Sequence, residues 1–543
     1  MKNILVTFLY ITSIVAVYSQ NTIGTLLNTD AANNAYTLFA PITSNQTYLI
    51  NNCGEIINQW NSNFLPGASV YLLENGNLLR TGRITNSEIN FGGLGGKIEL
   101  FDWDGNLLWE YTHSSSTFTQ HHDIYPLSNG NILLLSAEIM PLEEAIQAGR
   151  SPILLEDGRV FNEQVLEIEP IGTNQANIVW EWNVKDHLIQ DLDATKDNFG
   201  IIENNPQLLN FNYTNTTGSD ENWLHMNSLQ YNEDLDQIML SSRILSEIYV
   251  IDHSTTSLEA ATALGGDYGK GGDILYRWGN KEAYAKGNTA DRTLYGQHYP
   301  HWIANGLNDE GKILIYNNGN STRPYSSVDI IQPLTTTPGN YTYNSTTGYG
   351  PLIAESSYTA EINTDFYSVI LSSAQRLPNG NTLICEGDSG HFFEINTANE
   401  IVWDYVSPDT TLGIATQGDV PFSNLVFRAL KFPLDYPAFD NRTLTPMDPI
   451  ELNPNLDNCN LLSTPEFLLQ NIAINIYPNP VIDILNINYK EQIKRLQIFT
   501  ISGQILVTAN NTKTINLQNL TSGLYIIKIE TEKGIITKKL IKN

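Results

Sequence analysis

Three histidines of this chain share a local setting that could place them in one reactive site. Each precedes an apolar, strand-like run by about ten to fifteen residues. In a repeat protein, such equivalent positions fall on one face around one axis. Imidazole can act as a nucleophile, an acid or a base near neutral pH. The three segments are Gln120-His121-His122-Asp123, Trp223-Leu224-His225-Met226-Asn227-Ser228 and Gly296-Gln297-His298-Tyr299-Pro300.

A guanidinium completes the chemistry that these imidazoles could support. Transfer of a sulfuryl or phosphoryl group from an aryl ester passes through a loose, anionic, in-line transition state. Such a site needs a nucleophile, cationic donors for the equatorial oxygens and an acid for the leaving phenol. Arg243 ends the strand expected after His225, and its planar guanidinium suits sulfuryl oxygens. The candidate site residues are His298, His225, Arg243 and His122.

A repeat supplies the elements that must position these residues. Turn-type pairs precede strand-like runs, and Asn-Gly tolerates the positive φ angles of tight hairpins. An apolar pair ending in an aromatic residue follows at a variable distance. Units of roughly 50 or more residues with this pattern are typical of propeller blades of four antiparallel strands. The turn pairs are Asn75-Gly76, Asn129-Gly130, Glu310-Gly311 and Asn379-Gly380, with Glu233-Asp234 as a degenerate copy. The aromatic strands contain Trp60, Trp109-Glu110-Tyr111, Trp180-Glu181-Trp182, Tyr276-Arg277-Trp278 and Trp403-Asp404-Tyr405.

The N-terminal residues predict export. Residues 1–20 begin with Lys2, continue through an apolar stretch from Ile4 to Val17 and end in Ser19-Gln20. This pattern is that of a secretory signal peptide rather than of a membrane span. No other stretch approaches the ~20 apolar residues needed to cross a bilayer. The mature protein is expected to be secreted or held at the cell surface after passing through the periplasm.

The three cysteines Cys53, Cys385 and Cys459 allow at most one intramolecular disulfide, and their spacing leaves the pairing open. None of them forms a Cys-x-x-Cys pair. A structural role is therefore favoured over redox or metal chemistry.

The charge of the chain is uneven. The formal net charge is −29, yet Lys and Arg outnumber Asp and Glu from Val481 onward. A surface as acidic as that of the preceding residues repels nucleic acid and anionic membranes, so neither is an expected partner. A Pro- and Asn-rich connector is predicted over residues 451–468, followed by a small antiparallel β-sandwich over 469–543.

This C-terminal module has motifs of its own. They are Tyr477-Pro478-Asn479-Pro480, a Ser502-Gly503 turn, Leu520-Thr521-Ser522-Gly523-Leu524-Tyr525 and a Lys-rich close. In these features it resembles the C-terminal sorting domain of the type IX secretion system of Bacteroidetes. The resemblance implies an export address that the type IX machinery reads, without catalysis.

Residues 21–450 resemble the arylsulfate sulfotransferase family, a PAPS-independent group of secreted six-bladed propellers. The resemblance implies an all-β chain with a six-bladed β-propeller over residues 21–450. The signatures are His122-Asp123 before an Asn-Gly-Asn strand, Trp223-x-His225-x-Asn227-Ser228, Leu240-Ser241-Ser242-Arg243, and Gly296-Gln297-His298 leading to Ile315-Tyr316-Asn317-Asn318-Gly319.

The resemblance also implies roles for the candidate site residues. His298 matches the nucleophile that carries the sulfuryl group, while His225, Arg243 and His122 match residues that hold the sulfate and assist the leaving group. A protonated His122 or His225 is expected to neutralise the departing phenolate. Because side chains alternate along a strand, only one of His121 and His122 can point into the channel. His122 is predicted because the signature places its histidine next to Asp.

Other assignments remain open to test. His121, His122, Asp123 and His225 could together ligate zinc, but no pair has the close spacing of known zinc sites, so neither a metal nor a cofactor is expected. The predicted function is transfer of a sulfuryl group from a phenolic sulfate ester to a phenolic acceptor through a covalent sulfohistidine. The alternative is a secreted ligand-binding propeller without turnover. Structural roles are expected for His113, His187, His253, His301 and His391.

Overall fold

The computed structural model describes residues 21–214, 221–456, 459, 474–490, 492–500, 505–531 and 534–543. The predicted signal peptide and most of the predicted connector lie outside these residues. The chain divides into two compact units, Met1–Leu461 and Leu462–Asn543. No helix within the described ranges is long and apolar enough to span a membrane.

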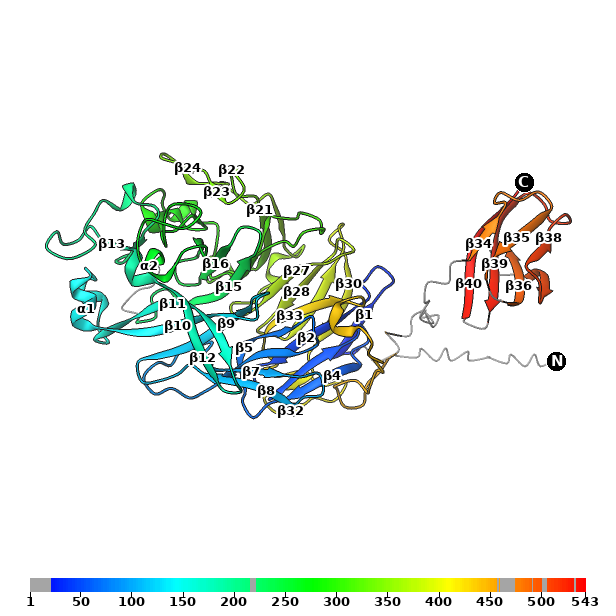
Figure 1. Cartoon of the computed structure of the whole chain (residues 1–543), viewed down its shortest axis with the longest axis horizontal. Helices are drawn as coiled ribbons and strands as arrows, with labels where there is room; N and C mark the ends of the chain where they lie inside the picture. The colour runs from blue at the N-terminus through cyan, green and yellow to red at the C-terminus, as the bar shows by residue number, and fades with distance from the viewer. Residues whose placement is uncertain are drawn as a thin grey trace, which may run out of the picture. The chain divides into compact units, whose positions relative to one another are not determined.

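Strands form nearly all of the regular structure in both units, as Figure 1 shows. The α-helices of the described residues are α1 (Leu142–Gln147) and α2 (Ser257–Ala260). Short 3-10 turns cover Pro152–Leu154, Val184–His187, Ile202–Asn204, Lys281–Tyr284, Thr289–Asp291, Asn363–Asp365 and Pro437–Phe439. The prediction of an all-β chain is confirmed.

The larger unit is built from antiparallel runs of four strands, each ordered from an inner strand outward. One sheet contains β33 (Val426–Pro433), β2 (Ala35–Pro41), β3 (Gln46–Ile50) and β4 (Ile56–Asn61). Another contains β15 (Met226–Asn232), β16 (Gln237–Ser242), β17 (Glu247–Asp252) and β18 (Tyr276–Trp278). A third contains β19 (His298–Trp302), β20 (Ile313–Asn317), β21 (Ser327–Ile331) and β26 (Ser356–Tyr358). A fourth contains β27 (Ser373–Arg376), β28 (Thr382–Glu386), β29 (His391–Ile395) and β30 (Ile401–Val406), with β1 (Gly24–Asn28) added outside β30.

The remaining large sheet departs from separate four-stranded blades. It joins β5 (Pro66–Leu72), β6 (Leu78–Arg83), β7 (Gly96–Phe101) and β8 (Leu107–Thr112) to β9 (Phe118–Pro126), β10 (Ile132–Pro141), β11 (Arg159–Ile171) and β12 (Gln175–Asn183). The link is a single parallel bridge between Ala68 and His122. Both residues have positive φ, and this local distortion brings the backbones of β5 and β9 within bonding reach.

Four separate two-stranded sheets also occur among the described residues of the larger unit. They are β13 (Leu188–Ile189) with β14 (Leu209–Asn210), β22 (Thr335–Thr337) with β23 (Asn340–Tyr341), β24 (Tyr343–Asn344) with β25 (Gly348–Tyr349), and β31 (Asp409–Thr410) with β32 (Gly413–Ile414).

The inner strands contact one another in a closed cycle. The contacts run from β5 to β9, β15, β19, β27, β33 and back to β5. Strand β33, from the C-terminal end of the unit, pairs with β2 near its N-terminal end and so closes the cycle. Labels of several inner strands lie near the middle of the larger unit in Figure 1. Residues far apart in sequence can therefore meet at the centre of this cycle.

The predicted turn pairs lie in hairpins that follow inner strands. Gly76, Gly130, Gly311 and Gly380 all have positive φ, as such turns require. The predicted aromatic strands are the outer strands β4, β8, β12, β18 and β30. Their tryptophans pack into the cores between sheets rather than lining the centre.

The described residues of the smaller unit form two antiparallel sheets. One contains β34 (Asn475–Tyr477), β35 (Ile484–Asn488) and β38 (Thr514–Asn516). The other contains β37 (Ile505–Asn510), β36 (Ile493–Thr500), β39 (Gly523–Thr531) and β40 (Gly534–Lys542). Alternate residues of both sheets, among them Leu485, Leu496 and Ile527, share one buried core.

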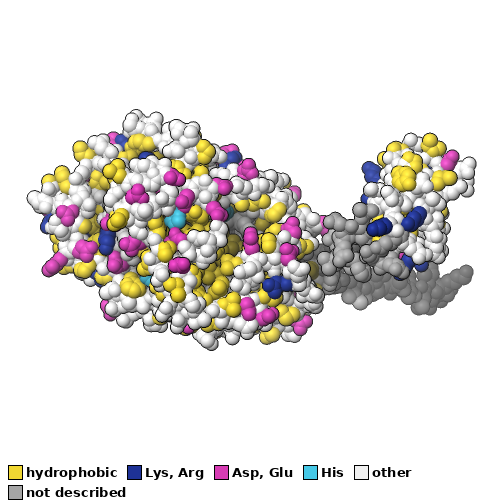
Figure 2. Space-filling model, in the orientation of Figure 1, with side chains coloured by type: hydrophobic (Ala, Val, Ile, Leu, Met, Phe, Trp, Pro, Cys, Tyr) yellow, Lys and Arg dark blue, Asp and Glu magenta, His cyan; other side chains and the backbone are white. Residues whose placement is uncertain are grey.

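A disulfide joins Cys53 to Cys459 across 406 residues and fixes the end of the larger unit to its first sheet. Cys385 is a free, buried thiol whose pKa is raised by burial. Asp and Glu side chains are scattered over the visible face of the larger unit, with few Lys and Arg between them (Figure 2).

Candidate active site

Distortions in three of the inner strands direct the candidate histidines to a common place. Each of β9, β15 and β19 carries a β-bulge at or near its histidine. His122 and His225 themselves have φ of 48° and 47°, and Tyr299, after His298, has φ of 49°. Positive φ in non-glycine residues is costly and is concentrated at functional sites. The bulges re-aim the side chains out of the regular alternation of the strand.

The four predicted site residues lie close together. His122 lies in β9, His225 directly precedes β15, Arg243 directly follows β16, and His298 begins β19. The ring centroids of His122 and His225 are 4.9 Å apart. Arg243 and His298 are close enough to both of these imidazoles to lower their pKa values.

His298 is held by a side chain whose orientation is fixed. The Asn318 amide donates from Nδ2 to the carbonyls of Ser368 and Leu371, at 2.9 and 3.0 Å. Its Oδ1 therefore faces His298 Nδ1 at 2.8 Å and can only accept. The proton of the neutral imidazole must then sit on Nδ1, which leaves the lone pair on Nε2.

His122 is held by its neighbour in the chain. Nδ1 of His122 lies 2.9 Å from Nδ1 of His121, and Nε2 of His121 lies 2.7 Å from a carboxylate oxygen of Glu163. His121 thus lies between His122 and Glu163, and the His122 ring lies against that of His225.

Arg243 and His225 are tied together through the backbone. The Arg243 N–H donates to the His225 carbonyl at 3.2 Å, and its guanidinium reaches the Val369 carbonyl at 3.5 Å. A β-carbon on Gly296 would lie in ordinary contact with the Arg243 side chain, so residue 296 packs beside it. The Asn222 amide contacts Nδ1 of His225 at 2.9 Å.

Burial and mutual repulsion keep the three imidazoles neutral. Burial, and then Arg243, lower the pKa of His298 to about 3. Burial, followed by His225, places the pKa of His122 well below 6.5, and burial with Arg243 does the same for the pKa of His225. This differs from the expectation of a protonated His122 or His225, because a cation there would be desolvated and would face the Arg243 guanidinium.

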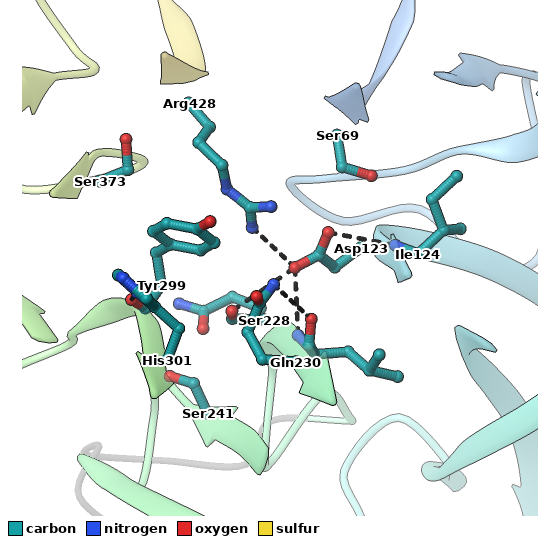
Figure 3. Close-up of polar contacts among 12 residues, drawn as sticks. Ser69, Asp123, Ile124, Ser228, Gln230, Ser241, Tyr299, His301, Ser373 and Arg428 are labelled. Carbon is teal, nitrogen blue, oxygen red and sulfur yellow. Dashed lines mark hydrogen bonds and ion pairs between the residues drawn. The ribbon is translucent and has the colours of Figure 1, made fainter. Parts of the chain in front are cut away.

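Asp123, the residue after His122 in β9, forms an ion pair with Arg428 (Figure 3). Arg428 in β33 donates from Nη2 to Asp123 Oδ2 at 2.7 Å, and both side chains are almost fully buried. Its guanidinium stacks over the Tyr299 ring at 3.8 Å. Tyr71 accepts a second bond from Arg428 at 2.8 Å. Asp123 is thereby committed to Arg428 and to the Leu229 N–H, which argues against its service as a zinc ligand beside His122.

A glycine-rich loop covers one side of His122. Phe91 stacks on the His122 ring at 6.2 Å and also packs against His121 at 5.1 Å. The Gly93 carbonyl accepts from the His122 N–H, and Gly93 has φ of +87°. A β-carbon on Gly93 would overlap the His122 ring, so only glycine fits there. Phe427 approaches from β33, with its ring 6.3 Å from that of His122.

The other histidines have separate partners. His301 follows the β19 bulge and bonds through Nδ1 to the Tyr299 carbonyl at 3.1 Å, so it does not join His298. His113 bonds to Ser136, and His187 bonds to Asp273 and to the Ala260 carbonyl. His253 bonds to Asp236 and Glu167, and His391 bonds to Glu386 and Asp404.

Three residues of the site, Asn318, Glu163 and Gly93, are not among the site residues predicted from the sequence. The signal for Asn318 was present, because it follows an inner hairpin in the same segment as the His298 signature. The run Phe91-Gly92-Gly93-Leu94-Gly95-Gly96 could have marked Gly93, since clustered glycines indicate close backbone approach. Glu163 carries no local signal.

The model of the arylsulfotransferase (ASST) family matches residues 31–418, which is most of the chain and includes all four candidate residues. The chain belongs to the arylsulfotransferase family. A second model, the secretion system C-terminal sorting domain, matches residues 475–543 of this arylsulfotransferase-family protein. No curated protein matches it significantly.

Solved structures similar to this family member have low sequence identity. A protein of unknown function from Bacteroides caccae is 11% identical, with a TM-score of 0.39 over 74% of this chain and 99% of that chain. A putative 6-phosphogluconolactonase from Bacteroides fragilis is 13% identical, with a TM-score of 0.33 over 74% and 99%. A periplasmic gluconolactonase from Pseudomonas aeruginosa is 10% identical, with a TM-score of 0.34 over 68% and 96%.

Proposed function

We propose that this protein transfers a sulfuryl group from a phenolic sulfate ester to a phenolic acceptor through a covalent sulfohistidine on His298. The lone pair on His298 Nε2 attacks sulfur as the bond from sulfur to the aryl oxygen breaks. The departing phenolate takes a proton from a histidine of the site, His122 or His225. The acceptor phenol then gives a proton back to that histidine as its oxygen attacks the sulfohistidine sulfur, and the bond from sulfur to Nε2 breaks to free His298.

The observation that carries this proposal is the fixed Asn318 amide. Because Asn318 can only accept from His298 Nδ1, the nucleophilic lone pair is on the nitrogen that the Asn318 bond leaves free. The depressed pKa keeps that nitrogen unprotonated throughout the neutral range, so the attack needs no separate base.

Arg243 and His225 bind the sulfuryl oxygens through their N–H groups. The Arg243 pKa is lowered by burial, yet a guanidinium stays charged in proteins. It provides several N–H donors for an anion, and the partial burial of Arg243 makes these donors act more strongly than in bulk water. A His225 N–H donates beside it without adding a second desolvated cation.

The proposal also covers the domain organisation and the cellular location of the protein. The cycle of inner strands supports six blades over residues 21–450, with the eight-stranded sheet counted as two of them. Residues 1–20 are the signal peptide, 451–468 the connector and 469–543 the sorting domain. The match to a secretion sorting domain supports recognition by the type IX machinery and a secreted or cell-surface location.

The test is incubation with 4-nitrophenyl sulfate, with and without added phenol, while 4-nitrophenol release is followed. We expect release that depends on the acceptor, ping-pong kinetics, and loss of turnover in a folded His298→Asn variant. Hydrolysis without acceptor dependence, or intersecting double-reciprocal lines, contradicts the mechanism. Tight binding of the sulfate ester with no turnover by the wild type supports the alternative of a ligand-binding propeller.

A further inference from the structure

Two buried titratable residues are connected to His122 by hydrogen bonds. Glu163 in β11 and His121 in β9 are fully buried, and they continue the line of hydrogen bonds that begins at His122. The other carboxylate oxygen of Glu163 accepts from the Met226 N–H at 3.0 Å, which fixes the carboxylate next to the strand that follows His225. Phe91 packs against both imidazoles, and both imidazoles are buried.

The geometry allows one hydrogen between the two facing Nδ1 atoms. While Glu163 is a carboxylate it accepts from His121 Nε2–H. In one state, His122 Nδ1–H donates to the lone pair of His121, and His122 Nε2 carries a lone pair. With one proton more, His121 donates from both nitrogens, and neutral His122 carries its hydrogen on Nε2. The extra proton therefore changes what His122 presents to the substrate without charging His122.

The surroundings decide where the positive charge of the second state lies. Burial and then the neighbouring His225, His121, His298 and Arg243 all disfavour a cation on the His122 ring. His121 instead contacts a buried carboxylate at 2.7 Å, which compensates a charge on its own ring. A buried charge requires such a partner, and Glu163 is the partner that His121 has.

We propose that Glu163 and His121 are positioning residues that switch His122 Nε2 between proton donor and proton acceptor, so that His122 serves the leaving phenol and the attacking phenol in turn. This inference rests on the proposed function. As the aryl bond to sulfur breaks, His122 Nε2–H passes its proton to the phenolate oxygen. His122 Nδ1 takes the hydrogen of His121 Nδ1, and His121 becomes neutral.

The second half-reaction reverses these transfers. The acceptor phenol gives its proton to the lone pair of His122 Nε2 as its oxygen attacks the sulfohistidine sulfur. The hydrogen on His122 Nδ1 returns to His121, which again becomes the cation beside Glu163. One complete turnover thus leaves the number of protons in the chain unchanged, and no group outside the site has to supply one.

The test compares donors that differ in how much they need an acid. A nitro group stabilises its phenolate, so 4-nitrophenyl sulfate depends on proton donation far less than phenyl sulfate does. General acid catalysis contributes about 10²–10⁴-fold. For Glu163→Gln we expect kcat/KM to fall about 100-fold with phenyl sulfate but less than about 10-fold with 4-nitrophenyl sulfate. The KM for both donors should change little.

His187→Gln is the matched control, because His187 is also fully buried and pairs with a carboxylate, Asp273, at 3.0 Å. It should affect both donors equally. Equal losses with both donors in Glu163→Gln, at a melting temperature like that of the control, overturn the proposal.

A second readout does not need turnover. In protein labelled with ¹⁵N-histidine, assigned with His121→Gln and His122→Gln, the ring nitrogens report which imidazole gains the extra proton on acidification. We expect His121 to become the imidazolium while His122 stays neutral and moves its hydrogen to Nε2. An imidazolium at His122 contradicts the proposal. If the wild type proves unable to transfer sulfate, the proposed function fails, and the nitrogen spectra still decide whether the switch exists.

Discussion

Replacement of Asn318 by Ala tests whether the hydrogen bond from His298 Nδ1 to Asn318 is needed for activity, while His298 itself is kept. The substitution removes the acceptor at 2.8 Å that keeps the imidazole proton on Nδ1. It also removes the donors to the carbonyls of Ser368 and Leu371. The ring stays in place, but nothing then holds its proton away from Nε2, the atom that must attack sulfur.

The size of the effect follows from the hydrogen bonds that are lost. A buried donor left without its partner costs about 1–3 kcal/mol. Since 1.36 kcal/mol corresponds to a factor of ten in rate, kcat/KM should fall roughly 5- to 150-fold. The KM for the donor should change little, because Arg243 and His225 remain to hold the sulfate. The loss should be similar for 4-nitrophenyl sulfate and phenyl sulfate, since nucleophilic attack is impaired for both.

Asn317→Ala provides a control of equal size. Asn317 is as deeply buried and also makes three hydrogen bonds, to Thr293, Asp329 and the Tyr295 N–H, but it does not touch His298. Both variants should lose thermal stability to a similar extent. The reasoning is refuted if Asn318→Ala stays within twofold of the wild type, or if Asn317→Ala loses as much activity.

Three further predictions concern other parts of the molecule. Arg243→Ala should weaken both donor binding and kcat, and Arg243→Lys should recover only part of each, because Lys lacks the planar fork; full recovery in steady-state kinetics contradicts a forked contact. Burial opposes charging of His253, but hydrogen bonds to Asp236 and Glu167 outweigh it and raise its pKa to about 9. The charged form of His253 therefore stabilises the fold fully below pH 6.5, and this contribution is lost as the pH rises through 9. His253→Gln should lower the melting temperature more at pH 6 than at pH 9.5; an equal loss at both values disproves the assignment. Deletion from about Ser463 onward should leave transfer intact in vitro and abolish export from a host with type IX machinery; loss of folding of the larger unit would place the boundary elsewhere.

Local patterns in the sequence predicted much of the fold. Asn-Gly pairs such as Asn75-Gly76 need positive φ, and this requirement depends on the turn alone. The outer-strand tryptophans and the inner-strand histidines recur at equivalent places because each run of strands faces the same neighbours. The eight-stranded sheet could not be predicted, because it depends on one backbone bridge between Ala68 and His122.

Side-chain partners distant in sequence could not be read from the chain. Asp123 pairs with Arg428 across 305 residues, and Cys53 with Cys459 across 406. The protonation state of the three imidazoles could not be predicted from the sequence either. It depends on how completely the site is buried and on the distance from each ring to Arg243, and both are properties of the assembled strands.

The most direct test of the central claim is to trap the sulfuryl group on the enzyme. The protein is mixed with ³⁵S-labelled 4-nitrophenyl sulfate without acceptor, quenched in alkali and digested, and the labelled peptide is sequenced. We expect a burst of one 4-nitrophenol per protein, one label on the peptide that contains His298, and release of that label when phenol is added before the quench. Label on another residue, or acceptor-dependent transfer with no labelled protein at any time, would contradict a sulfohistidine at His298.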